Sequence, residues 1–335
     1  MTAALALLGY AVGAAWCVPA LLAPLTRHGI SVRAGLAAWL TAMASVLLSG
    51  TVAVLFSVRT AAADWPRLTA TLCRSVAGGA CTPEVYRSLF YQAGVAVLAA
   101  VLAVASVVAL WRYGRRVQRS RRQTRAHAAA ARLVGRALAT GAGSGAVVRR
   151  QAEAVVLDDP RPAAYCVAGR PAAIVLTSGA LEVLDPPQLG AVLAHERAHL
   201  AHADHLLATL TQGLAAAFLG VPLFAQGAAE VARLAEMSAD DTAARASGRP
   251  ALVAALLAIA TGAAISSTGI PSTGIPSTGV PGGALAAAAH AVPARVERLL
   301  RPPTPGRSAA FTAMLTLALA LLAAAPLALA LFAAR

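Results

Sequence analysis

Two histidines and a glutamate near the middle of the chain have the spacing of a metal site. The stretch 193–200 contains His195, Glu196 and His199 in the pattern His-Glu-x-x-His, within a run rich in Ala and Leu that favours a helix. Residues four apart on a helix share a face, so both imidazoles can bind one metal ion. Glu196 lies next to them, where it can take a proton from the water that attacks the substrate. The pattern predicts hydrolytic zinc chemistry.

An acidic run at 236–241 offers the third ligand. A hydrolytic zinc ion takes three protein ligands and leaves one position for water. Glu236 is the predicted third metal ligand, and Asp240, one turn further on, is predicted to hold a ligand imidazole in its orientation. Asp204 is expected either to orient a metal-binding histidine or to cap a helix. Without the upstream motif, the acidic run would be interpreted as a solvated helix face.

Peptide hydrolysis also needs a group that stabilises the oxyanion. The candidates are His202, His205, His290, Arg295 and Arg298. The sequence does not select among them. His202 and His205 equally fit the solvated end of a helix.

The composition is that of a membrane protein. Of the 335 residues, 58% are hydrophobic and only 13% are charged, whereas about 25% are charged in a typical soluble domain. Uncharged stretches predict four transmembrane helices, at about 3–24, 34–58, 89–111 and 308–334. Because these stretches hold no ionisable residues, a transporter is the least favoured function.

An arginine cluster after the third span predicts the orientation in the cell membrane. Its members are Arg112, Arg115, Arg116, Arg119, Arg121, Arg122 and Arg125. Such clusters stay in the cytoplasm, so the catalytic domain is expected there and both termini outside. Because Tyr113 is the only aromatic residue near these arginines, the cluster is expected to bind anionic lipid and not nucleic acid. Cys73 and Cys81 then lie in an external loop, either as a small disulfide or as two unpaired thiols.

The chain divides into four predicted parts: three spans in 1–113, a basic linker helix in 114–150, a zinc metallopeptidase domain in 151–303 and the last span. Three tandem Ser-Thr-Gly-Ile/Val-Pro repeats form a loop at 267–281 of the domain. Cys166 is interpreted as a packing residue.

Short strands are expected at Ala154–Leu157, Ala163–Val167 and Ala172–Thr177, before the metal helix. The strand at Ala172–Thr177 is the candidate edge for binding an extended peptide, and an interior position fits equally well. Asp185, followed by two prolines, is predicted to start the metal helix.

The uncharged stretch 206–229 separates His199 from Glu236. A single membrane crossing there would place these two ligands on opposite sides of the bilayer. The stretch is therefore predicted to be a helical hairpin, with the metal helix running to about Gly220 and a second helix returning through Glu236. The break is expected at Gly220–Pro222, because proline cannot continue the helix. The sequence leaves open whether the hairpin tip enters lipid.

The order of spans and motifs resembles the β-lactam-sensor, or antirepressor-type (BlaR/MecR-like), family of integral-membrane zinc metallopeptidases. The matching elements are 172–179 before the metal helix, 193–199, Asp204, Glu236–Asp240 and Arg295–Leu300. The neighbouring family of heat-shock and prenyl-protein endopeptidases shares the zinc motifs but arranges its spans differently. Sensor members carry a drug-binding domain after the last span, whereas this sequence stops at Arg335, so the resemblance implies a peptidase without the sensor domain.

The expected fold is mainly α and integral to the membrane: four transmembrane helices plus a cytoplasmic α+β gluzincin-like domain with a small sheet. The expected function is that of a zinc metalloendopeptidase acting on a cytoplasmic or membrane-associated protein, in regulatory signalling. The alternative is a non-catalytic receptor or scaffold whose structural Zn²⁺ has a fourth protein ligand, His202 or Asp204. The expected partners are a protein or peptide substrate and the lipid bilayer, and a homodimer is left open.

Overall fold

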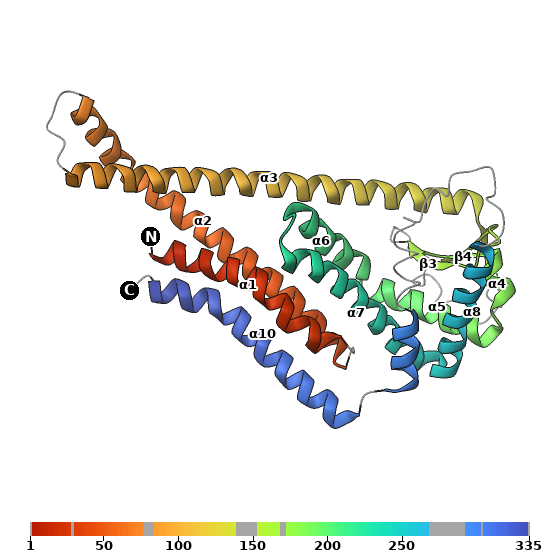
Figure 1. The fold of residues 1–335 in the computed structure, drawn as a ribbon. Coiled ribbons are helices and arrows are strands. Elements are labelled where there is room, and N and C mark those ends of the chain that lie inside the picture. The colour runs from red at the N-terminus through yellow and green to blue at the C-terminus, as the bar shows by residue number, and fades with distance from the viewer. Residues whose placement is uncertain are drawn as a thin grey trace, which may run out of the picture.

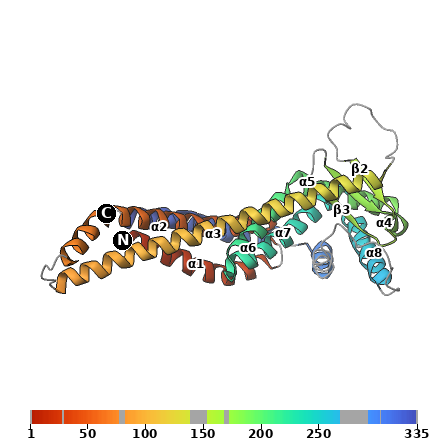
Figure 2. The same cartoon turned by 90° about the horizontal axis from the view of Figure 1, so that it is seen from above.

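The computed structural model describes residues 2–27, 30–76, 83–138, 153–167, 172–267, 292–302 and 304–333. The molecule is elongated, with the membrane bundle toward one end and the small sheet at the other (Figures 1 and 2). Four helices are long and apolar enough to cross a membrane, over Ala4–Thr26, Val32–Trp65, Ala93–Gln123 and Ser308–Leu329. The predicted fold class, four apolar spans plus an α+β domain, is confirmed.

Three of the spans form one tightly packed group. They belong to α1 (Thr2–Thr26), α2 (Val32–Val76) and α10 (Pro305–Ala333). Ser45 joins all three, because its hydroxyl lies 2.6 Å from the hydroxyl of Tyr10 and donates to the carbonyl of Leu322 at 2.7 Å. These bonds satisfy polar groups that lipid cannot solvate.

Two helices extend beyond their predicted spans. The second span is predicted to end at residue 58, with an external loop after it, but α2 continues as a helix to Val76. The content of Ala, Arg and Leu in this segment permits the longer helix. α3 (Pro83–Val134) joins the third span and the first part of the basic linker in one continuous helix. The pairing of Cys73 with Cys81 and the repeat loop at 267–281 lie outside the described side chains.

The sheet places a different strand at its edge from the one expected. Its order is β1 (Arg136–Ala137), β2 (Glu153–Leu157), β4 (Ala173–Thr177), β3 (Ala164–Val167). β4 pairs in parallel with β2 and antiparallel with β3, and all five of its residues are buried. The expectation that Ala172–Thr177 offers its edge to a peptide is therefore wrong. β3 occupies an edge of the sheet instead, because the chain returns on the far side of β4.

The helices after the sheet are α4 (Ser178–Val183), α5 (Pro186–Ala201), α6 (Asp204–Ala217), α7 (Pro222–Ser247) and α8 (Arg249–Ser267), followed by a helical segment at 292–300. α5 begins as predicted, because the side chain of Asp185 accepts from the Gln188 amide while the Gln188 side chain accepts from the Asp185 amide. This reciprocal cap fixes the start of the helix that carries both histidines.

The predicted helical hairpin is present, formed by α6 and α7. Its turn lies at the predicted break, with Gly220 at a φ of 80° and Pro222 opening α7. The metal helix does not run on into the hairpin, however. α5 ends at Ala201, and Ala203 has a left-handed φ of 55°. This turn directs Asp204 back toward His199. The left-handed backbone of Ala203 is a strained conformation of the kind found where a site requires it.

Candidate metal centre

Helix α5 contributes two imidazoles that point in the same direction. His195 and His199 are separated by one turn, and their rings lie edge to face with centroids 4.6 Å apart. Their Nε2 atoms are 3.0 Å apart. Two imidazole nitrogens turned toward one point, on largely buried side chains, are suited to share a cation.

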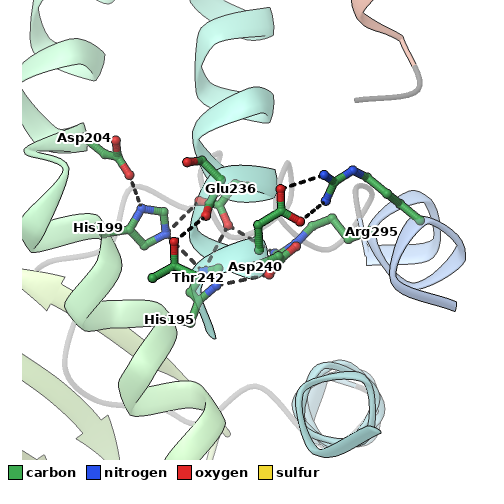
Figure 3. Close-up of polar contacts among 10 residues, drawn as sticks. His195, His199, Asp204, Glu236, Asp240, Thr242 and Arg295 are labelled. Carbon is green, nitrogen blue, oxygen red and sulfur yellow. Dashed lines mark hydrogen bonds and ion pairs between the residues drawn. The ribbon is translucent and has the colours of Figure 1, made fainter. Parts of the chain in front are cut away.

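Helix α7 brings a carboxylate to the same point (Figure 3). The Oε2 atom of Glu236 lies 3.5 Å from Nε2 of His195, and its Oε1 atom lies 3.4 Å from Nε2 of His199. One ligand atom from each of the three residues lies within 4.8 Å of the others. The structure thus brings together the three predicted metal ligands. Two imidazoles and a carboxylate are the donor set of hydrolytic zinc sites.

A second carboxylate stands behind each imidazole. Asp204 lies 2.7 Å from Nδ1 of His199 through its Oδ2 atom. Asp240 lies 3.1 Å from Nδ1 of His195 through its Oδ1 atom, at ion-pair distance but without the angle of a hydrogen bond. Both carboxylates are buried. With Nδ1 facing a carboxylate, each ring presents Nε2 to the metal position.

Arg295 joins these carboxylates from the segment at 292–300. Its Nε and Nη2 atoms donate to the two oxygens of Asp240 at 2.7 and 2.6 Å, and its Nη1 atom lies 3.1 Å from Oε2 of Glu236. The guanidinium side chain is 6% exposed, so the pair with Asp240 is shielded from water. Arg298 makes a similar two-bond contact with Asp241, which is more exposed.

The ionisation of the site depends on these contacts. Burial alone would lower the pKa of His195, but the carboxylates of Asp240 and Glu236 outweigh it and raise that pKa to about 9. Burial would raise the pKa of Glu236, yet His195 and the charge of Arg295 lower it to about 2. Burial likewise opposes the shift at Asp240, where Arg295 and His195 lower the pKa to about 2. Without metal, the centre therefore holds a proton on His195.

Glu196 has a neighbour that the sequence did not reveal. Glu196 is buried, and the thiol of Cys166 lies against its carboxylate. Burial first, and the charge of Glu196 second, raise the pKa of this thiol, so it stays protonated. Cys166 belongs to β3 and is thirty positions from Glu196 in the sequence, so no local pattern could have indicated the contact. The predicted general base thus lies beside the edge strand.

The candidate oxyanion groups are placed differently from one another. Both arginines are already paired with carboxylates. His202 is the C-cap residue that follows α5, and its buried Nδ1 atom has no hydrogen-bond partner among the described residues. His205 is exposed, and His290 lies outside the described residues. None of them belongs to the group of three ligands found among the described residues.

Comparison with known proteins identifies the domain that carries this centre. Residues 125–266 match the model of peptidase family M48. This part of the chain is an M48 peptidase domain. The matched range includes α5 and Glu236, but it ends before the segment that supplies Arg295. No protein of known structure matches the chain.

Similar proteins share the name "Protease HtpX homolog". The one from Acidiphilium cryptum is 42% identical over 64 residues, which make up 18% of this chain and 22% of that protein. The one from Tropheryma whipplei is 39% identical over 67 residues, or 19% and 23% of the two chains. The one from Ralstonia nicotianae is 36% identical over 72 residues, or 21% and 25%. The match spans about a quarter of these relatives, and the β-lactam-sensor subtype stays a prediction.

Proposed function

We propose that this protein is a membrane-bound zinc-dependent endopeptidase. The observation that carries the proposal is the convergence of His195, His199 and Glu236 on one point, with Glu196 next in sequence to the first ligand. We propose further that the domain faces the cytoplasm and cleaves a cytoplasmic or membrane-associated protein, with both termini outside. The arginine cluster after the third span supports this orientation.

The residues of the centre have distinct proposed tasks. His195 and His199 would hold zinc through Nε2, and Glu236 through its carboxylate. Bound zinc would supply a Lewis acid, which lowers the pKa of water toward neutrality and polarises a carbonyl. The Glu196 carboxylate takes a proton from the attacking water and gives it to the nitrogen of the leaving amine.

The outer charged residues position the ligands. Asp204 and Asp240 fix the two imidazole rings, and Arg295 fixes the carboxylates of Glu236 and Asp240. Because the Arg295 guanidinium is already bonded to both carboxylates, we assign it a positioning role and not the stabilisation of the oxyanion.

Strand β3 is the proposed binding edge for an extended substrate. It has β4 on one side, and its Cys166 contacts Glu196. A peptide that paired with the other side of β3 would therefore run past the general base.

A non-catalytic scaffold with a structural zinc ion is the alternative. A structural site is closed by four protein ligands, whereas the group among the described residues has three. Asp204, one of the two candidates for a fourth ligand, is engaged with Nδ1 of His199. The arrangement therefore favours a site with one position left for water.

Three spans before the domain and one after it support the sensor-type organisation and a role in regulatory signalling.

The decisive experiment compares Glu196→Gln with Arg197→Gln in the full chain. Arg197 is the exposed neighbour of Glu196 and has no part in the centre. We expect the Glu196 variant to retain zinc, measured by metal analysis, and to lose cleavage of cellular proteins, measured as new protein termini in cells. The Arg197 variant should retain both. Normal cleavage by the Glu196 variant would refute the endopeptidase assignment of this site.

A further inference from the structure

The α6–α7 hairpin lies alongside the membrane-spanning part of α2. Gly227 on α7 faces the side chains of Met43 and Trp39, and a Cβ atom at Gly35 would meet Leu234 at 3.2 Å. α2 begins at Val32, so Met43 lies about 16 Å along its axis, at a rise of about 1.5 Å per residue. The tip of the hairpin, which precedes Gly227, reaches at least that far along the span.

The other helix of the hairpin lies against α3. Gly213 on α6 is covered by the ring of Tyr113, whose nearest carbon would lie 2.6 Å from a Cβ atom at that position. Tyr113 follows the third apolar stretch and precedes most of the arginine cluster, a position typical of aromatic side chains at the membrane surface. From Gly213, α6 continues toward the tip on the span side of this tyrosine.

The outer surface of the hairpin is uncharged and largely apolar, with Gln212 and Gln226 as its exposed polar side chains. No charged residue occurs from 206 to 229. Leu206 and Leu210 share one face of α6 and are 56% and 41% exposed, and Leu219 at the tip is 67% exposed. Leucines of the lipid-facing spans have similar exposure, for example Leu48 at 55%. The hairpin thus continues the apolar surface of the bundle.

A polar cluster marks where this apolar zone ends. Arg233 donates to the carbonyls of Thr26, the last residue of the first span, and Arg27, the residue after it, at 2.7 and 2.9 Å. Glu230 accepts from Arg233 at 2.7 Å and from the Thr26 hydroxyl at 3.2 Å. The first charges on α7 therefore lie level with the end of α1, where a span meets water.

We propose that the α6–α7 hairpin is embedded in the leaflet that faces the peptidase domain, with Leu206, Leu210 and Leu219 in contact with lipid acyl chains. Glu236 is three residues beyond Arg233, or about 4.5 Å along the axis. The hairpin therefore holds the metal centre immediately beside the membrane surface. This inference goes beyond the proposed function and does not depend on it.

Lipid is the favoured partner of the exposed leucines, because they continue the apolar surface of the spans. The hairpin packs on α1, α2 and α3, so lipid that surrounds these spans also reaches its outer leucines. A second copy of the chain would have to displace that lipid. Contact with another copy is the outcome that the experiment must separate.

Spin labels at single cysteines test the depth of the hairpin. We would replace the four native cysteines by serine and introduce one cysteine at Leu206, Leu210 or Leu219. Leu48→Cys serves as the lipid reference and Arg197→Cys as the water reference. In phosphatidylcholine liposomes, we expect the ratio of oxygen to nickel-chelate accessibility at Leu219 to match that at Leu48. It should exceed the ratio at Arg197 several-fold and decrease from Leu219 through Leu210 to Leu206.

A ratio at Leu219 like that at Arg197 would overturn the proposal, as would spin–spin broadening between copies with low access to oxygen. A second measurement uses the unaltered chain, so that misfolding of a variant does not decide the result. A phospholipid with a diazirine in its acyl chain should label peptides from 206–224 on illumination. Labelling confined to the four spans would also overturn the proposal. Both readouts are independent of zinc and of cleavage.

Discussion

Helix α7 carries an arginine–carboxylate cluster at each of two levels, and the clusters differ in origin and in burial. Near the membrane, Arg233 pairs with Glu230 one turn away on the same helix, and both side chains are 23% exposed. At the metal centre, Arg295 comes from a distant segment to pair with Asp240, and the two side chains are 6% and 1% exposed. The first cluster joins α7 to the end of α1, and the second joins it to α5.

The comparison shows that similar charge pairs contribute different amounts of free energy to stability. A local, partly exposed pair contributes little by itself, because water and salt screen it. A buried pair leaves an uncompensated charge in the interior when one partner is lost. Only the buried cluster contacts the metal ligands, so function and stability should depend on it more strongly.

The largest expected difference is in metal binding. Glu236→Ala removes a proposed metal ligand, and we expect zinc affinity to fall by more than about 100-fold, beyond the loss seen when outer partners of a ligand are removed. Cleavage should be abolished. Glu230→Ala, six residues earlier on the same helix, should leave zinc affinity unchanged. Zinc titration of both purified variants measures this contrast, and equal losses would remove the functional distinction between the clusters.

Stability should follow burial. We expect Arg295→Met to reduce the free energy of unfolding of the domain by about 3–5 kcal/mol, because Asp240 keeps a buried charge without a partner. Arg233→Met should cost less than Arg295→Met: loss of its ion pair contributes about 1 kcal/mol or less, and loss of its bonds to the carbonyls of Thr26 and Arg27 adds to this. Arg298→Met is the matched control, since it removes a two-bond pair to the more exposed Asp241. Denaturant unfolding in detergent would show this order, and equal costs for all three variants would contradict it.

Loss of a carboxylate behind a ligand should weaken the centre without dismantling it. Asp204→Asn keeps the shape of the side chain but removes the charge that faces Nδ1 of His199. We expect zinc affinity to fall by about 10- to 100-fold. Asp241→Asn, which alters a carboxylate outside the ligand group, should bind zinc normally. An unchanged affinity in Asp204→Asn would show that the turn at Ala203 has no role in orienting the ligand.

The effect of raising the pH on stability should reverse when zinc binds. In the metal-free protein, the pKa of His195 is raised from 6.5 to about 9, so its stabilising effect is complete below 6.5 and is lost as pH rises through 9. The pKa of Glu236 is lowered from 4.5 to about 2, so its effect is complete above 4.5 and is lost as pH falls toward 2. Zinc requires His195 without its proton, so zinc affinity should rise by about tenfold per pH unit up to about 9.

Unfolding of the metal-free and zinc-loaded forms across pH measures this reversal. The metal-free domain should lose stability between about pH 6.5 and 9, while the stabilisation that zinc adds should increase over the same range. Zinc affinity that is constant with pH would contradict a protonated His195 in the free centre.

The sequence predicts those parts of the centre that depend on local geometry. The spacing of His195 and His199 is sufficient, because a helix puts such residues on one face. Glu236 is predicted because a hydrolytic zinc ion takes three protein ligands and an acidic run follows the histidines. The hairpin is predicted from a constraint on topology: two ligands of one ion cannot lie on opposite sides of a bilayer. Gly220 and Pro222 then indicated the turn of the hairpin correctly.

The errors concern features that depend on distant packing. The edge position of β3 depends on how the chain crosses β4, which the residue pattern of either strand does not encode. The left-handed turn at Ala203 carries no glycine or asparagine signal, since alanine seldom adopts it. The contact of Cys166 with Glu196 likewise arises only when the sheet packs on α5.

Helix α3 joins the far side of the bilayer to the peptidase domain without a break. Its 52 residues span about 78 Å at the usual rise per residue. It contacts α6, β2 and β3, so the hairpin and the proposed substrate strand both pack against the same rigid helix. A tilt of about 5° displaces one end of such a rod by about 7 Å relative to the other. Because spans tilt to match bilayer thickness, the position of the proposed substrate strand β3 becomes sensitive to the thickness of the surrounding membrane.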